Sequence, residues 1–447
     1  MTRYEELLAR LLPARRFGVV LGLERMEAIF ERLGHPERQL GRVIHVGGTN
    51  GKGSTVRMIG QLLQYELRDK TRQSRVATYT SPHLSTLRER IRFDDELITE
   101  DAIVAAADQV RDHGGDELTF FEQLTAIACV AIADHGVDFT VLEVGLGGRL
   151  DATNAVPAEV AVVTGVAIDH AAILGDTLEA IALEKAGIFK PHQKVVIGAS
   201  GEPAAVPGLI EAARRVGARI SVVDAAAIEA VEAMSTAHLG GFQQRNAANA
   251  VAAVAALDLW ILDLQVQHLR PPPGRFELVE RDDVDIILDG AHNPHAAAAL
   301  AAELRARGIQ PLLIVAASSD KDVTGIAAAL APVARGVITT RYQQDRAMAP
   351  ALLADVFRRA TSNAAGGAAS ISIETAPNLA AALARARDPA GPFHQSPSGS
   401  VIHPRPEIVI TGSLFLVGEA RTLFLGVPTD PYVVTDPPSN GDGFQLP

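Results

Sequence analysis

The stretch RVIHVGGTNGKGST, residues 42–55, decides the fold of the first part of this chain. A short β-branched apolar run leads into a glycine-rich turn, and helix-forming residues follow the turn directly. Glycines in such a unit let backbone N–H groups surround phosphate oxygens, and the helix N-terminus adds positive potential. Lys52 can reach the β- and γ-phosphates, and Ser54 or Thr55 can face a bound metal. Gly53 separates Lys52 from Ser54, so the spacing departs from the common phosphate-loop pattern, but the stretch still predicts a nucleotide-binding loop.

Apolar runs alternate with helix-forming stretches on both sides of this loop. The runs are continuous rather than alternating with polar residues, which is typical of parallel strands covered on both faces. We expect helices at 3–12, 54–68, 121–136 and from Asp176 to Gly187. We expect strands at 42–46, 74–79, 138–144, 158–166, 194–198 and 218–224. The pattern predicts an α/β domain around a parallel sheet.

A proline run, RPPPG at 270–274, interrupts the pattern, because three prolines fit neither a helix interior nor a central strand. The alternation then restarts, with expected strands at 284–288, 311–315, 336–340, 371–375 and 407–411. We therefore expect an N-terminal domain over 1–273 and a second, smaller α/β domain over 274–425. A Pro/Gly-rich tail follows at 426–447, and an exposed insertion is expected at 389–406.

Composition restricts the class of protein. The 447 residues include 41 Lys and Arg against 53 Asp and Glu, a net charge of −12, which argues against binding to nucleic acid or anionic membranes. The single cysteine, Cys129, lies in an apolar stretch and excludes a disulfide framework. No apolar run approaches the roughly 18–20 residues of a membrane helix, and the N-terminus lacks a signal-peptide core. We expect a cytoplasmic protein.

Three further residues could serve a nucleotide site. Glu143 closes an expected strand beside a glycine-rich turn, and a rigidly held carboxylate suits magnesium, which takes oxygen ligands and shares phosphate oxygens. His170 ends the run AVVTGVAIDH and, taken alone, is better explained as a loop histidine that bonds within the chain. Lys185 lies near the end of an expected helix, where a lysine is usually a solvated charge, and composition alone does not decide its role.

Short motifs then occur in a familiar order and spacing: GTNGKGS, SPHL, EVGLGGRLDATN, IDH, EKAGIFK, PGRFE, DGAHNP, DKD and TGSLFLVGE. Together, across residues 17–425, they resemble the folylpolyglutamate synthase/dihydrofolate synthase family of the Mur ligase superfamily. The resemblance implies a Mur-ligase-like α/β fold, with an N-terminal P-loop ATPase domain and a smaller, Rossmann-like C-terminal glutamate-ligase domain. It also implies a monomer acting on small molecules, namely ATP, L-glutamate and a folate or dihydropteroate.

The resemblance assigns roles position by position. It implies two magnesium ions with Ser81, Glu143 and His170 as ligands, and it identifies Lys185 as a lysine that becomes N-carboxylated. Lys52, Glu143, His170 and Lys185 are then the expected catalytic residues. The ATP contacts that it implies are Thr49, Asn50, Gly51, Lys52, Gly53, Ser54, Asn246, Arg275, Asp289 and His292. The folate-side pocket that it implies contains Thr119, Phe120, Phe121, Glu122 and Asp151.

The implied reaction passes the γ-phosphoryl group of ATP to a folate carboxylate, and the amine of glutamate then attacks the acyl phosphate. Three positions depart from the family pattern: Val19-Val20 replace an acidic residue, Ala171-Ala172 replace a bulkier polar pair, and VAASSDKD lacks the usual glycine. The first departure weakens the expectation of dihydropteroate binding. Two alternatives stay open: a ligase for another carboxylate, such as a peptidoglycan precursor, and a nucleotide-binding paralogue without catalysis.

Overall fold

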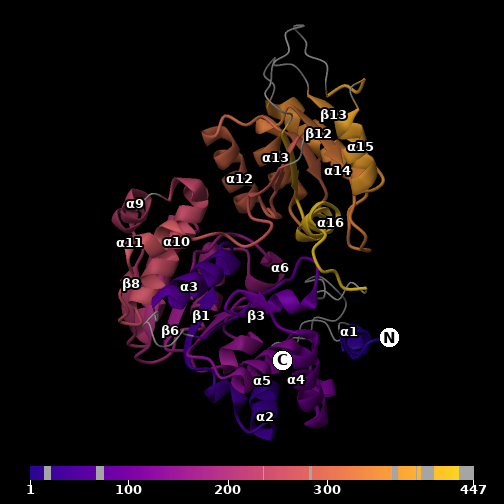
Figure 1. Ribbon diagram of the computed structural model, residues 1–447. Helices are drawn as coiled ribbons and strands as arrows, with labels where there is room; N and C mark the ends of the chain where they lie inside the picture. Colours follow the sequence, from indigo (N-terminus) through magenta and orange to yellow (C-terminus); the bar gives the residue numbers. More distant parts are fainter. Residues whose placement is uncertain are drawn as a thin grey trace. The chain divides into compact units, whose positions relative to one another are not determined.

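The structure is a computed structural model that describes residues 1–14, 22–66, 75–234, 236–280, 284–364, 371–388, 390–393 and 407–431 (Figure 1). The chain divides into two compact units. Unit 1 comprises Met1–Pro272 and Asp430–Pro447, and unit 2 comprises Pro273–Thr429. The Val19-Val20 pair, most of the expected insertion and most of the expected tail lie outside the described residues.

Unit 1 is built on a sheet whose described strands number eight, in the order β4-β3-β2-β5-β1-β6-β7-β8. All neighbours from β2 to β8 pair in parallel, which confirms the expected parallel sheet. Most strands are shorter than expected: β1 (Arg42–Gly47), β2 (Val76–Tyr79), β3 (Ile91–Phe93), β4 (Glu96–Leu97), β5 (Phe139–Glu143), β6 (Val160–Val163), β7 (Lys194–Ile197) and β8 (Arg219–Val222).

The antiparallel edge of this sheet was not expected. Strands β3 and β4 form a hairpin, and β3 pairs antiparallel with β2. The turn consists of Asp94 and Asp95, both at positive φ (51° and 69°), a conformation that matches the twist of a two-residue hairpin. Strands of three and two residues leave too few apolar positions for a sequence pattern to detect.

Helices cover both faces of the unit 1 sheet and bury three described apolar clusters. Helix α5 packs in one cluster, where Cys129 is 1% exposed, so the expectation of a core cysteine is confirmed. Helices α3 and α10 contact each other in a second cluster, and α7 and α8 contact each other in the third. The helices are α1 (Arg3–Ala14), α2 (Glu24–Arg32), α3 (Lys52–Glu66), α4 (Glu100–Asp112), α5 (Phe120–His135), α6 (Ala171–Leu174), α7 (Leu178–Ala186), α8 (Val206–Arg215), α9 (Ala225–Ala233), α10 (Gly240–Ala255) and α11 (Asp263–Gln267).

The start of α7 differs from the expected start at Asp176. The N-cap is Thr177, whose hydroxyl accepts a hydrogen bond from the backbone N–H of Ala180 at 3.2 Å. Threonine satisfies one of the first helical N–H groups as well as aspartate does, and two adjacent capping residues cannot be distinguished by pattern alone. The helix ends before Gly187, as expected.

Unit 2 contains a sheet with six described strands, in the order β13-β12-β11-β14-β10-β9. All of its pairs are parallel except β9–β10. The strands are β9 (Glu277–Glu280), β10 (Asp285–Leu288), β11 (Leu312–Val315), β12 (Gly336–Thr339), β13 (Ser372–Thr375) and β14 (Glu407–Thr411). The helices are α12 (Pro294–Ala306), α13 (Val323–Leu330), α14 (Pro350–Ala364), α15 (Leu379–Arg387) and α16 (Leu414–Leu425). Among the described helices of the whole chain, none has the length and apolar content needed to cross a membrane.

Candidate active site

The glycine-rich loop follows β1 and runs directly into α3. Gly48 and Gly51 have φ of 143° and 84°, which residues with a Cβ rarely adopt. A Cβ on Gly51 would also lie 2.3 Å from Oδ1 of Asn246. The backbone N–H of Thr49 donates to the Gly165 carbonyl at 2.9 Å, which ties the loop to the end of β6. The sequence therefore fixes a tight loop at the carboxyl end of the central strand.

Two lysine side chains meet at this loop. Lys52 Nζ donates to the carbonyl oxygens of Gly48 (3.1 Å) and Thr49 (3.3 Å), and Lys185 Nζ donates to the same Gly48 carbonyl at 3.1 Å. Lys185 is 4% exposed. Burial first, and the charge of Lys52 second, lower the pKa of Lys185 to about 7. Two cationic groups at one carbonyl would favour an anionic ligand.

Glu143 lies at the end of β5 beside the same loop. Its side chain is buried, and Oε2 accepts a hydrogen bond from the backbone N–H of Ser81 at 3.1 Å. A Cβ on Gly53 would lie 3.4 Å from that oxygen, so the carboxylate borders the loop directly. The hydroxyl of Thr55 is buried and has no hydrogen-bond partner in the part of the chain that the structure describes. The structure thus brings together Ser81, Glu143 and the loop.

His170 stands just before α6 with a positive φ of 52°. Its Nε2 lies 3.9 Å from Oδ1 of Asp169, and the same oxygen accepts the His170 backbone N–H at 2.8 Å. No three His, Cys, Asp or Glu side chains gather as a metal site in the described ranges. Magnesium also takes hydroxyl, phosphate and water oxygens, so a buried carboxylate with adjacent Ser81 suits that ion better than zinc.

Asn246 in α10 lies behind the loop, against Gly51. Its side chain is fully buried, its Oδ1 accepts from the hydroxyl of Ser200 at 2.8 Å, and its Nδ2 donates to Gln243 at 3.0 Å. These contacts support the shape of the loop. The predicted contact of Asn246 with adenine stays a prediction.

In unit 2, three predicted residues gather after β10. Asp289 accepts a hydrogen bond from the backbone N–H of Phe276 at 2.9 Å. Burial raises the pKa of Asp289, and the charge of Arg275 lowers it by less. A Cβ on Gly290 would lie 2.7 Å from Nη1 of Arg275. His292 Nδ1 lies 2.8 Å from the Gly290 carbonyl oxygen. Arg275, Asp289 and His292 therefore belong to one local cluster.

Comparisons with known proteins identify the family of this chain. Residues 46–205 match the Mur ligase middle domain, and residues 274–392 match the Mur ligase glutamate ligase domain. The dihydrofolate synthase/folylpolyglutamate synthase of Mycobacterium tuberculosis (strain H37Rv) is 34% identical, and the match covers 95% of this chain and 94% of that protein. This chain belongs to the folylpolyglutamate synthase/dihydrofolate synthase family of Mur ligases.

One further relative is about twice as long as this chain, and two others have solved structures. A probable bifunctional folylpolyglutamate synthase/dihydropteroate synthase of Haloferax volcanii is 35% identical over 94% of this chain, which spans 50% of that protein's length. The structure of Escherichia coli FolC in complex with DHPP and ADP has a TM-score of 0.78 at 27% identity and covers 95% of this chain and 98% of that one. A Yersinia pestis bifunctional enzyme complexed with AMPPNP and Mn ion has a TM-score of 0.75 at 27% identity, covering 92% and 94%.

The predicted folate-side residues of this family member are held differently from the loop residues. Thr119 caps α5, and Glu122 completes a capping box by accepting the Thr119 backbone N–H at 2.8 Å. Arg25 of α2 donates to both oxygens of Glu122, at distances from 2.7 to 3.1 Å. The polar groups of the 119–122 segment are thus bonded within the chain.

The two phenylalanines of that segment have different surroundings. Phe120 is fully buried in the core, and the Arg90 guanidinium lies over its ring at 5.6 Å. Phe121 is only partly buried, and its ring centroid lies 6.2 Å from that of Tyr79. A Cβ on Gly145 would lie 2.5 Å from the Phe121 ring, so the glycine makes room for this aromatic side chain. Phe121 is therefore the better placed of the two to contact a ligand.

Asp151 belongs to a buried chain of hydrogen bonds. Its carboxylate accepts from the hydroxyl and backbone of Thr153 and from the Leu146 N–H, while His45 Nε2 lies 2.8 Å from the Thr153 hydroxyl. Burial raises the pKa of Asp151, whereas burial first, and the charge of Lys190 second, lower the pKa of His45 to about 3.

Sequence reasoning missed His45 and Arg25. A histidine inside an apolar strand was the available signal for His45, but Arg25 offered none.

Proposed function

We propose that this chain is an ATP-dependent ligase that activates a folate carboxylate as an acyl phosphate, joins it to L-glutamate, and accepts dihydropteroate as well as folates. The first step moves the γ-phosphoryl group onto a carboxylate oxygen. The glutamate amine then adds to the carbonyl carbon, loses a proton, and displaces inorganic phosphate. The products are an amide, ADP and phosphate.

One observation carries this proposal: Lys52, Lys185 and Glu143 meet around a glycine-rich loop in a chain related along nearly its whole length to folate ligases. Phosphoryl transfer depends mainly on positioning and on neutralising charge. The loop N–H groups and Lys52 can bind phosphate oxygens, and Lys52 can turn from the Gly48 carbonyl toward a ligand. These contacts would offset the repulsion between a carboxylate and a polyphosphate.

Magnesium fits the residues present. Glu143 is the buried carboxylate, and Ser81 lies beside it through its backbone hydrogen bond. When bound, the ion would supply positive charge to the phosphate oxygens during transfer. We assign Ser81, Glu143 and His170 to two such ions, and Ser54 to the side of the loop that faces them. Without any ion, Glu143 holds the backbone of Ser81 through that hydrogen bond.

Lys185 is proposed to be N-carboxylated. Its nitrogen would attack the carbon of carbon dioxide and lose a proton, which exchanges an ammonium for a carbamate. Near its lowered pKa of about 7, a substantial fraction of Lys185 is the neutral amine that this addition requires. Carboxylation also removes the repulsion from Lys52. Carbon-13 NMR in labelled bicarbonate should show a carbamate signal that disappears in Lys185→Ala, and its absence from the parent protein contradicts the assignment.

In unit 2, Arg275, Asp289 and His292 are proposed to hold nucleotide. Arginine can bind phosphate bidentately and keeps its charge at any working pH. Arg275→Ala should raise the KM for ATP while circular dichroism shows both units folded. An unchanged KM for ATP together with unchanged turnover would mean that Arg275 contacts no ligand.

A substrate panel tests the proposed activity. Phosphate release from ATP is measured with glutamate and each of dihydropteroate, folate, tetrahydrofolate and a UDP-muramyl acid. Release with both dihydropteroate and tetrahydrofolate supports a bifunctional enzyme, and release with tetrahydrofolate alone restricts it to polyglutamylation. Release only with the UDP-muramyl acid would overturn the folate assignment. Nucleotide binding without release on any substrate would favour an inactive paralogue.

A further inference from the structure

The segment that precedes β3 is held by a residue from the far end of the sequence. Asp430 is the point at which the chain rejoins unit 1 after unit 2. Its backbone N–H donates to the Ser85 carbonyl at 3.1 Å. Its carboxylate accepts from the Thr86 hydroxyl at 2.7 Å and from the Leu87 backbone N–H at 2.7 Å. Three hydrogen bonds therefore tie Asp430 to residues 85–87.

This segment, 81–90, depends on carboxylates for its shape. Glu89 accepts the backbone N–H groups of residues 84, 85 and 86, and Asp430 accepts that of residue 87. Four consecutive N–H groups are thus satisfied by two acidic side chains, and only one of these belongs to the segment itself. The start of the segment is Ser81, whose N–H donates to Glu143. The start and the middle of the segment are therefore held by different carboxylates.

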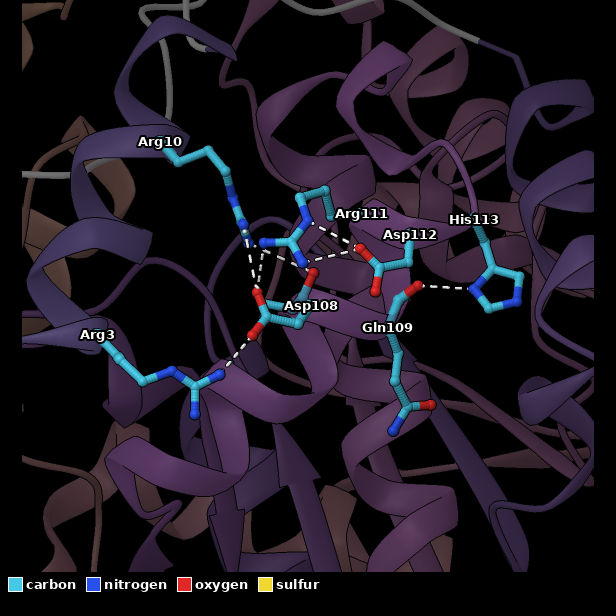
Figure 2. A network of polar contacts seen from close by, with 8 residues as sticks. Arg3, Arg10, Asp108, Gln109, Arg111, Asp112 and His113 are labelled. Carbon is cyan, nitrogen blue, oxygen red and sulfur yellow. Dashed lines mark hydrogen bonds and ion pairs between the residues drawn. The ribbon is translucent and has the colours of Figure 1, made fainter.

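Helix α1 adds a second contact to the same carboxylate. The Tyr4 hydroxyl donates to Asp430 at 3.0 Å and lies 3.2 Å from the Thr86 hydroxyl. The same helix is also held to α4 by Asp108, which accepts hydrogen bonds from Arg3 and Arg10 (Figure 2). Two aspartates therefore anchor α1, but only Asp430 also bonds to the 81–90 segment. This difference provides a matched control.

The geometry points to Asp430 as a positioning residue for the ligase reaction: it fixes residues 85–87 so that Ser81 stays beside Glu143. The inference rests on the proposed metal site. Asp430 is partly buried, and burial raises its pKa, whereas the hydrogen bonds that it accepts lower the pKa. Both carboxylate oxygens accept hydrogen bonds from the segment, but an asparagine side chain has one accepting oxygen, so it should hold the segment less firmly.

The test compares Asp430→Asn with Asp108→Asn. Asparagine keeps the shape of the side chain, but its NH₂ group would face one of the groups that donate a hydrogen bond to Asp430, so that bond is lost. Amide exchange in peptides covering 81–90 should accelerate in Asp430→Asn without any ligand, and the magnesium concentration for half-maximal phosphate release should rise by about threefold or more. Turnover at saturating magnesium should stay within about twofold. Asp108→Asn should change neither quantity, even where it lowers the melting temperature as much.

Tyr4→Phe separates the two routes by which Asp430 could act. It removes the bond from α1 and leaves those to Thr86 and Leu87, so it should behave like the parent protein in both measurements. Equal effects of Tyr4→Phe and Asp430→Asn, or of the two asparagine variants, would overturn the inference, because Asp430 would then only stabilise the packing of α1. Unchanged exchange in Asp430→Asn would overturn it as well.

Glu143→Gln, measured in the same assay, distinguishes this inference from the metal assignment. If Glu143→Gln impairs magnesium activation and Asp430→Asn does not, the role of Asp430 fails alone. If Glu143→Gln has no effect, the metal assignment fails. The link from Asp430 to catalysis fails with it, and the exchange data then report only on the segment.

Discussion

The glycine-rich loop and the 119–122 segment both carry predicted site residues, yet their polar groups have different partners. At the loop, Lys52 and Lys185 donate to one backbone carbonyl, and Glu143 borders the turn. At the 119–122 segment, Glu122 is bonded to Arg25 and to the start of its own helix. At the loop two lysines share one acceptor, whereas at the segment a carboxylate and a guanidinium are paired.

This difference in partners distinguishes a motif that binds a ligand from a motif that stabilises the fold. Placing two lysines together without an anion between them costs stability, because each disfavours the charge of the other. Such an arrangement is expected where a ligand supplies the missing charge. A capping box whose buried carboxylate pairs with a partly exposed arginine is explained by folding alone. The loop therefore indicates a function by its geometry, and the 119–122 segment by its resemblance to a family.

The strongest test of the loop is Glu143→Gln. We expect the fold to be kept and turnover to fall by more than about tenfold, on the order of 2 kcal/mol of transition-state stabilisation, because the proposed anionic metal ligand is lost. Phosphate release at saturating magnesium measures the loss. Glu37→Gln, which alters a buried carboxylate in a different part of unit 1, is the control and should keep the parent's turnover. A Glu143→Gln enzyme within about twofold of the parent would mean that Glu143 holds no metal.

Much of this architecture could be predicted from sequence, because each unit repeats one pattern. Strands such as β1 and β14 lie where continuous apolar runs placed them, and the loop followed from its glycines. The β3–β4 hairpin could not be predicted because it is too short. The bond from Asp430 to residue 87 could not be predicted either, since nothing local relates residues that far apart. Sequence can show that a residue belongs to a motif, but not which partner its side chain has.

The next test concerns the folding cost of the two lysines. The pKa of Lys185 is lowered from an ordinary 10.5 to about 7, so between these pH values the unfolded chain binds a proton that the folded chain does not. The free energy of unfolding should therefore rise with pH across this interval, by up to about 1.4 kcal/mol per pH unit from this group. Lys185→Met should remove that contribution.

Urea denaturation at pH 7, 8 and 9 in bicarbonate-free buffer measures this pH dependence for both proteins. Other ionisations are common to the two and cancel in the difference between them. Parallel curves would show that Lys185 keeps an ordinary pKa. The folded loop would then not disfavour the charged form of Lys185, and the electrostatic difference between the loop and the 119–122 segment would be smaller.

The same contrast predicts a structural effect at Glu122. Glu122→Gln breaks the pair with Arg25 in a side chain that is 3% exposed, so unfolding free energy should fall by roughly 1–3 kcal/mol. The KM for dihydropteroate should change by less than about threefold. Denaturation and initial rates on the same preparation measure both quantities. A large rise in KM with unchanged stability would show that Glu122 binds substrate directly and would remove the distinction between the two regions.

The smallest expected effect belongs to Phe121, the one predicted folate-side ring that is not fully buried. Phe121→Leu keeps apolar volume against Gly145 and Tyr79 but removes the aromatic face available to a pterin or aminobenzoyl ring. Such a stack contributes about 0.5–1.5 kcal/mol beyond burial, which corresponds to a rise in KM of roughly two- to tenfold for the folate substrate. Phe120→Leu is the matched control, because that ring lies in the core: it should lower the melting temperature and leave KM unchanged. If both variants leave KM unchanged, neither ring contacts the substrate, and the 119–122 segment serves only the fold.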